Sequence, residues 1–182
     1  MKLQIADCRL QIGPIGTIGL AVLLVVALVR LGGTETIDRV LAVVNGELIT
    51  LSDVKAAREL GLVSAGDAAD PVASVLSRLI DRSLELEEVE RYAPPEPSAD
   101  EVNGELDAVR AKFTSPAAFE AALARSGLEL PRLRDVVREN LRIRAYLDQR
   151  FAAADRREQL VNEWLAALRR RAEIIDLYAT RP

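Results

Sequence analysis

Histidine is absent from the 182-residue chain, and cysteine occurs once, at Cys8. Without histidine the chain lacks the most common general base, the usual activator of a serine or cysteine nucleophile and the most common zinc ligand. A single cysteine excludes an intrachain disulfide, a CxxC redox pair and a thiolate metal cluster. The sequence therefore argues against most classes of enzyme, and we expect no catalytic, cofactor-binding or metal-binding residues.

Aromatic residues are also scarce, at 4% of the chain, whereas hydrophobic residues make up 49% and charged residues 29%. This balance is typical of a globular protein, and the abundance of Leu, Ala, Val and Arg favours helices. The length allows one compact domain of ordinary size beside a leader. We therefore expect a single, mostly helical domain.

Surplus positive charge is lacking as well, because the formal net charge is −4. Residues 1–33 contribute +2 of this, from Lys2, Arg9 and Arg30 against Asp7, which leaves −6 for residues 34–182. General nucleic-acid binding needs an excess of cations that neutralise phosphates. An acidic domain therefore argues against a nucleic-acid partner.

An uncharged apolar run extends from Ile12 to Val29, preceded by Lys2 and Arg9 and followed by Arg30. Its length is at the lower limit for a bilayer-spanning helix, and its basic start and apolar middle also fit a secretory signal. A buried core helix is the alternative, but no polar face runs along the segment. Residues 1–33 are predicted to be a signal peptide or an uncleaved signal anchor, and both place residues 34–182 outside the cytoplasm.

The domain begins with a predicted β-hairpin over residues 38–50. β-Branched residues flank Asn45-Gly46, and this dipeptide supplies the two positive-φ residues that a type I′ turn requires. Thr50 and Asp53 then form a variant of the capping box. This signal predicts a first helix over about 51–61.

Capping signals and helical periodicity indicate five more helices. Asp70-Pro71, Ser98 with Glu101, and Ser115-Pro116 are typical N-terminal signals, and Gly127 is a typical stop. The apolar residues between these signals recur at helical spacing. The predicted helices cover about 71–92, 99–113, 116–126, 131–153 and 156–171, and Asp155 is expected to cap the last of them.

The pattern changes over about 172–178, where the sequence AEIIDLY is typical of a strand. A two-stranded ribbon alone is marginal in water, so the hairpin is the most economical partner for this segment. The predicted fold is therefore mostly α, with a small β-hairpin completed by a C-terminal strand.

Several stretches resemble the SurA-type periplasmic chaperones, whose relatives carry parvulin prolyl isomerase domains. Residues 37–54, IDRVLAVVNGELITLSDV, are similar to the family's opening hairpin and first helix. Residues 79–86, LIDRSLEL, are similar to the helix that follows, and residues 119–150 resemble the family's helical hairpin. Residues 160–178 are similar to its C-terminal helix and strand. The resemblance implies that residues 34–182 form a SurA N-terminal-domain-like chaperone domain.

The chain departs from that family at one place. A parvulin domain separates the long helix from the terminal helix in such chaperones, whereas here residues 151–155, FAAAD, join them directly. The absence of histidine agrees, because parvulin sites usually include it. The resemblance therefore implies binding of unfolded or nascent exported proteins without isomerase activity, in the periplasm or at the inner membrane facing it.

Aromatic and leucine side chains on the middle helices are the candidates for client contact. If the helices form an open cradle, these side chains line an apolar groove for extended client segments, and simple core packing is the alternative. The candidates are Phe113, Phe119, Leu123, Tyr146, Leu147 and Phe151.

Three further features have structural interpretations. The cluster of Glu85, Glu87, Glu88 and Glu90 is expected to form a solvated face, because a hard-cation site needs carboxylates that converge from a loop. The basic run 169–171 is expected to complement the dipole at a helix end rather than to bind lipid or a partner. Trp164 is expected to belong to the core.

The missing isomerase domain leaves a second function open, that of a dedicated interaction subunit of an envelope assembly complex with one membrane partner. A chaperone that binds many clients would suppress the aggregation of unrelated unfolded proteins. A dedicated subunit would instead copurify with one stoichiometric protein. The sequence does not decide between them.

Overall fold

A computed structural model describes residues 38–152 and 155–179. Within these residues the fold is mostly helical with a small antiparallel sheet of three strands, which confirms the predicted fold class. The predicted leader, residues 1–33, lies outside the described residues. Of the helices in the described ranges, none combines the length and the hydrophobicity that crossing a bilayer requires.

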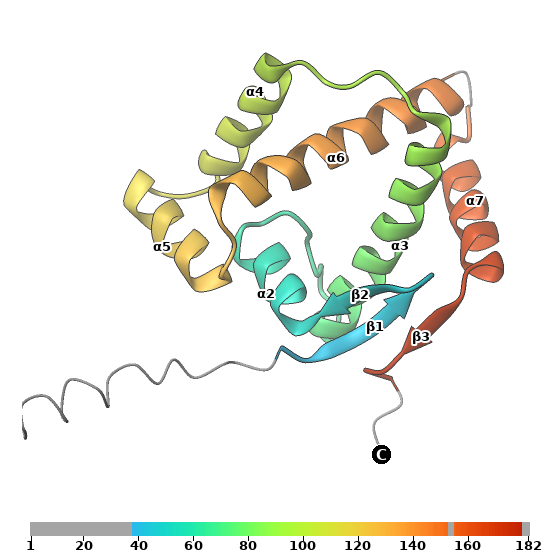
Figure 1. The fold of residues 1–182 in the computed structure, drawn as a ribbon, viewed down its shortest axis with the longest axis horizontal. Helices are drawn as coiled ribbons and strands as arrows, with labels where there is room; N and C mark the ends of the chain where they lie inside the picture. The colour runs from blue at the N-terminus through green and yellow to red at the C-terminus, as the bar shows by residue number, and fades with distance from the viewer. Residues whose placement is uncertain (1–37, 153–154, 180–182) are drawn as a thin grey trace, which may run out of the picture. The chain divides into compact units, whose positions relative to one another are not determined.

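The predicted hairpin consists of β1 (Val40–Val44) and β2 (Glu47–Thr50). Asn45 and Gly46 connect them with φ values of 47° and 90°, as the type I′ turn requires. The strand β3 (Ile174–Asp176) pairs antiparallel with β1, and the strand order is β2-β1-β3 (Figure 1). The C-terminal strand thus completes the hairpin, as the sequence predicts.

Side-chain caps begin four helices at the predicted positions. Thr50 and Asp53 form a full capping box, as do Ser98 and Glu101, and the Asp70 carboxylate accepts hydrogen bonds from two backbone N–H groups. Such a cap typically stabilises a helix by about 1 kcal/mol. The four helices are α2 (Leu51–Glu59), α3 (Pro71–Tyr92), α4 (Ala99–Arg110) and α5 (Pro116–Ser126), the last capped by Ser115.

The remaining helices, α6 (Leu130–Arg150) and α7 (Arg157–Arg171), begin without a side-chain cap. The prediction that Asp155 caps the last helix is wrong, because the residue at the cap position is Arg156. Some elements also end earlier than predicted. The helix predicted over 99–113 ends at residue 110, because the N–H of Phe113 bonds to the carbonyl three residues back and the last turn is tighter than an α-helix.

The buried hydrophobic residues of the described domain form two main cores. The first lies between the sheet and helices α2, α3 and α7, and the second is built by the end of α2 with α4, α5 and α6. A smaller cluster joins α3 to the far end of α6 through Val89, Ile143 and Tyr146, with Trp164 of α7 packed against it. The long helix α6 therefore contacts the second core at one end and the α3–α7 layer at the other (Figure 1).

Candidate functional site

A cleft lies where the two cores meet, lined by β2, α2, α3 and the first half of α6. Its apolar lining is shared between the cores, since Val63 and Leu79 pack against the first and Leu62 and Leu128 against the second. Val136 of α6 completes the lining and is a member of neither cluster. All five side chains are half-buried, so each presents some apolar surface to the cleft.

The cleft encloses about 160 Å³. Sites that take up a whole small molecule are larger, about 300–1,000 Å³. Its size and its partly exposed aliphatic lining fit apolar side chains of a larger ligand better than a cofactor.

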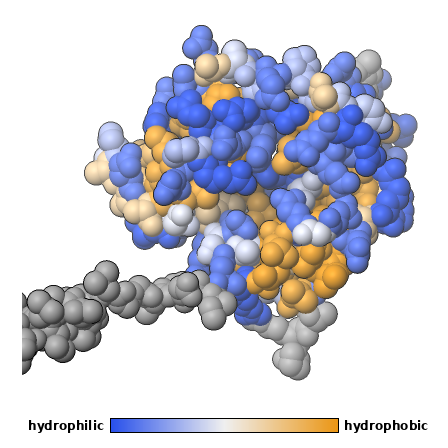
Figure 2. Space-filling view, viewed as in Figure 1, coloured by the Kyte–Doolittle hydropathy of each residue, from blue (hydrophilic) through white to orange (hydrophobic). Residues whose placement is uncertain are grey.

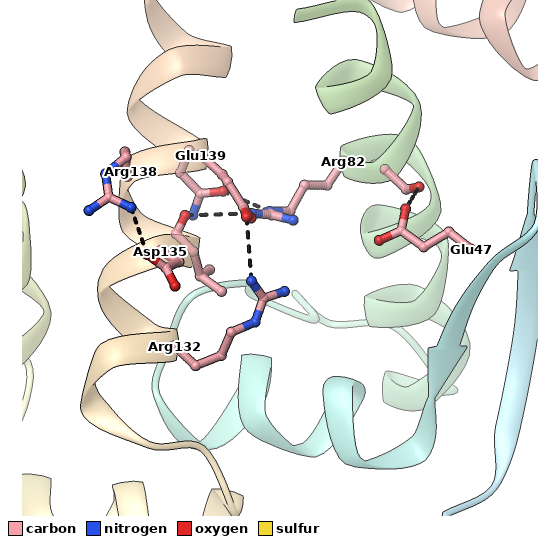
Figure 3. Close-up of polar contacts among 9 residues, drawn as sticks. Glu47, Arg82, Arg132, Asp135, Arg138 and Glu139 are labelled. Carbon is pink, nitrogen blue, oxygen red and sulfur yellow. Dashed lines mark hydrogen bonds and ion pairs between the residues drawn. The ribbon is translucent and has the colours of Figure 1, made fainter. Parts of the chain in front are cut away.

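An arginine network ties the helical walls of the cleft together. Figure 3 shows Arg82 of α3 reaching the Glu139 carboxylate of α6, at 2.6 Å from Nη2 to Oε2. Arg82 Nε also donates to Asn140 Oδ1 at 2.7 Å, and Arg132 Nη1 lies 3.4 Å from the other Glu139 oxygen. The side chains of Arg82 and Glu139 are only 21% and 22% exposed. The network fixes α3 against α6 beside the cleft.

Replacing Arg82 by methionine should lower the free energy of unfolding by about 1.5–3 kcal/mol, because two charge-assisted hydrogen bonds are lost and Glu139 remains half-buried. Chemical denaturation of both proteins measures the loss. The control is Arg110→Met, whose partner Asp107 is exposed, and which should cost at most about 1 kcal/mol. Equal losses in the two variants would contradict a structural role for the network.

Carboxylates mark the strand side of the cleft. The Glu47 carboxylate of β2 accepts a hydrogen bond from Ser83 Oγ at 2.5 Å, and the Asp53 carboxylate accepts from the backbone N–H of Thr50 at 2.8 Å. Arg132, on the α6 side, is exposed. The rim is thus acidic beside β2 and basic on the facing helix.

The six candidate client-binding residues lie in two separate places, and none of them lines the cleft. Phe119 and Leu123 are buried in the second core, with the half-buried Phe113 edge-on to Phe119 at 5.6 Å between ring centroids. Tyr146 is buried in the smaller cluster with the half-buried Leu147 packed against it, and the half-buried Phe151 lies edge-on to Trp164 at 5.9 Å between ring centroids. Their contact with clients stays a prediction, and the buried members offer little surface for it.

Sequence reasoning missed the residues that line the cleft. For Leu48 a signal exists, because strand alternation places it on the face opposite to the buried Ile49, where it is 57% exposed. For Val136 no signal exists, since an apolar residue beside Val137 in a helical pattern looks like part of the core. The cleft itself depends on how two cores are placed, which no local pattern encodes.

The acidic cluster on α3 differs in part from the expected solvated face. Glu88 is 7% exposed and bonds to Arg91 at 2.9 Å, while Glu87 accepts from Asn45 Nδ2 at 2.5 Å. Glu85 is half-buried, and burial raises its pKa to about 7. The expectation is wrong for Glu88, because α3 turns that side chain toward the hairpin tip and α7.

The basic run at the end of α7 has a tertiary contact as well as a place near the helix end. Arg169 Nε lies 2.6 Å from the Asp81 carboxylate of α3, and its Nη2 donates to the carbonyl and the hydroxyl of Ser77 at 2.8 Å each. Arg169 therefore fastens α7 to α3. Trp164 packs against the first core and the smaller cluster, as predicted.

In the ranges that the structure describes, no group of three or more Asp, Glu, Cys or His side chains is placed to hold a metal ion. No protein-family model matches the chain, and no curated protein matches it.

Proposed function

We propose that this protein holds unfolded or partly folded exported proteins, without isomerase activity, as the SurA-type chaperones that its sequence resembles do. The observation that carries the proposal is the cleft between the two cores, whose apolar lining comes from both. Partly exposed aliphatic side chains accept apolar groups without demanding a particular shape. A site of this kind suits clients that share hydrophobicity but not sequence.

Other features support the same proposal. The apolar run near the N-terminus favours export or anchoring, so the protein would act in the periplasm or at the inner membrane facing it. The acidic domain disfavours nucleic acid as a competing ligand. The direct connection between α6 and α7 leaves no room for an isomerase domain between them.

An aggregation assay tests the proposal. The full chain in lipid nanodiscs is added at increasing ratios to an outer-membrane protein diluted from denaturant, and light scattering follows aggregation, with empty nanodiscs as the blank. We expect suppression that rises with dose and extends to an unrelated unfolded protein. No suppression at several-fold excess would overturn the proposal.

A substitution in the cleft tests whether the cleft is responsible for the suppression of aggregation. Val136→Glu places a carboxylate among the aliphatic residues of the cleft without removing a member of either core. Desolvating that charge against an apolar client costs at least about 1.4 kcal/mol, so roughly tenfold more protein should be needed for half-suppression. The matched control is Val161→Glu, a half-buried valine of α7 outside the cleft lining, which should leave suppression unchanged.

The outer face of the sheet favours a second candidate function, that of a dedicated interaction subunit. Leu48, Ile175 and Leu177 are large hydrophobic side chains that are exposed here, and Figure 2 shows a hydrophobic area over the sheet. Exposed apolar patches often mark protein interfaces. Copurification of one stoichiometric partner, together with no suppression of aggregation, would favour this candidate.

A further inference from the structure

The backbone of β2 has one open edge. Among residues 38–152 and 155–179, β1 is the central strand and β2 pairs with a strand on one side only. On the other side of β1, the N–H of Asn45 donates to the Glu173 carbonyl and the N–H of Leu177 donates to the Leu41 carbonyl, both at 2.9 Å. Residues 41 and 45 of this segment therefore bond toward β3. Because every second residue of an antiparallel strand bonds to the same neighbour, the N–H and C=O of Val43 also face β3, opposite Ile175. Leu48 lies opposite Val43 in the register. Its own N–H and C=O therefore point away from β1, toward the open edge.

The neighbouring positions of β2 are already engaged. The backbone N–H and C=O groups of Glu47 and Ile49 point the other way, toward β1, where these residues lie opposite Val44 and Ala42. Thr50 again faces the open edge, but its N–H donates to the Asp53 carboxylate at 2.8 Å. Leu48 is thus the residue of β2 at which a donor and an acceptor are both presented outward.

This edge is continuous with the cleft. Glu47, Leu48 and Ile49 all contribute to the cleft lining, opposite Val136 of α6. On the face of the sheet opposite to the buried Ile49, Leu48, Val43 and Ile175 form one row across the three strands. A strand added at the edge would place alternate side chains in the cleft and beside this row.

We propose that an extended apolar segment of a client adds to β2 as a fourth strand, pairing with the backbone of Leu48 while alternate side chains enter the cleft. This inference rests on the proposed function and specifies how the client is bound. Another polypeptide backbone supplies an acceptor and a donor at strand spacing, and main-chain pairing is independent of client sequence. Such pairing explains how one short site accepts many clients.

The charged residues near the open edge of β2 indicate which client segments bind best. Glu47 and Asp53 place two carboxylates along the β2 side of the cleft, next to the position of an added strand, whereas Arg82 and Arg132 lie on the facing wall and share the single Glu139 carboxylate. A segment with Lys or Arg beside its apolar stretch complements this edge, whereas flanking acids are repelled. The occupant is therefore an extended, apolar polypeptide segment with basic flanks.

The test uses the full chain in lipid nanodiscs and a labelled short peptide in which Leu and Thr alternate between terminal lysines. Fluorescence anisotropy measures binding to the wild type, to Leu48→Pro and to Leu48→Val. Proline removes the outward N–H, and an edge strand tolerates it because that N–H bonds to nothing within the sheet. We expect binding weakened about tenfold by Leu48→Pro and clearly less by Leu48→Val, which shortens the side chain but keeps the outward N–H.

A second measurement needs no variant. Two further peptides carry N-methyl groups on the Leu residues or on the Thr residues, so each loses the N–H groups of one edge of its strand. Pairing at β2 predicts that one pattern abolishes binding and the other leaves it intact. Equal effects of both patterns, or absence of peptide binding, would overturn the edge-pairing proposal. The aggregation assay reports separately on client holding, so holding without edge pairing is recognised as such.

Discussion

Replacing Phe119 by alanine is expected to lower the free energy of unfolding by about 3–5 kcal/mol. Phe119 is 2% exposed in the second core and packs edge-on against Phe113. The ring lies between α4, α5 and α6, whose other core residues cannot close the cavity completely. Because folded domains are typically stable by only about 5–15 kcal/mol, this loss is a large share of the total.

Chemical denaturation followed by the fluorescence of Trp164, the chain's one tryptophan, measures the effect. The matched control is Phe113→Ala, since Phe113 is half-buried at the edge of the same core and should cost clearly less. The pair also separates the two roles considered for Phe119. Unchanged stability with lost suppression of aggregation would make Phe119 a client contact rather than a core residue.

A glutamine at position 85 is expected to stabilise the protein at pH 8 and to have little effect at pH 4. Desolvation by burial and, to a smaller extent, the nearby Asp81 carboxylate raise the pKa of Glu85, Arg82 partly offsets both, and the net pKa is about 7 instead of 4.5. In the ranges that the structure describes, Glu85 has no hydrogen bond or ion pair that would compensate a charge. Its ionised form is therefore destabilising.

The sign follows from comparing the folded and unfolded states. Below about pH 4.5 both states carry a protonated Glu85, and the residue costs nothing. Between about pH 4.5 and 7 the unfolded chain releases the proton first, so the folded state loses stability as the pH rises, and above about 7 the cost is constant. The pKa rises from 4.5 to about 7, so at about 1.4 kcal/mol for each tenfold change in proton affinity the full cost is on the order of 3 kcal/mol.

The measurement compares wild type with Glu85→Gln by chemical denaturation at several pH values. Backbone hydrogen bonds lower the pKa values of capping carboxylates such as Asp70 and Glu101, so their contribution to stability is lost in acid. This loss is the same in both proteins, so it cancels in the difference between their free energies of unfolding. The control is Glu90→Gln, a substitution of an exposed residue of the same helix, which should leave the free energy of unfolding nearly unchanged. A constant difference between Glu85→Gln and wild type at all pH values would contradict the proposed cost of ionisation.

The sequence by itself determined the elements of this protein and most of their boundaries. Asn45-Gly46 specifies the type I′ turn, because this turn needs two consecutive residues with positive φ and few residue types adopt that conformation readily. Ser98 and Glu101 specify a helix start because both bonds of the capping box lie within four residues of chain. Signals of this kind are local, and a distant part of the fold rarely overrides them.

The C-terminal strand also followed from the sequence, by a different argument. A segment typical of a strand needs a partner, and the hairpin was the economical one. The pairing of β3 with β1 confirms that reasoning. At Asp155 the local argument failed, since an available capping side chain does not ensure that the chain enters the helix at that residue.

Only the tertiary structure decided which side chains share an environment. Helical periodicity marks Phe119 and Val136 alike as apolar, yet one lies inside a core and the other lines a cleft between cores. In the sequence Glu85 and Glu88 look like solvated charges and Arg169 like a cation at a helix end, but the tertiary structure half-buries Glu85, buries Glu88 and pairs Arg169 with Asp81 of α3. Burial and charge pairing depend on distances between residues far apart in the chain, and those distances exist only after the helices have packed.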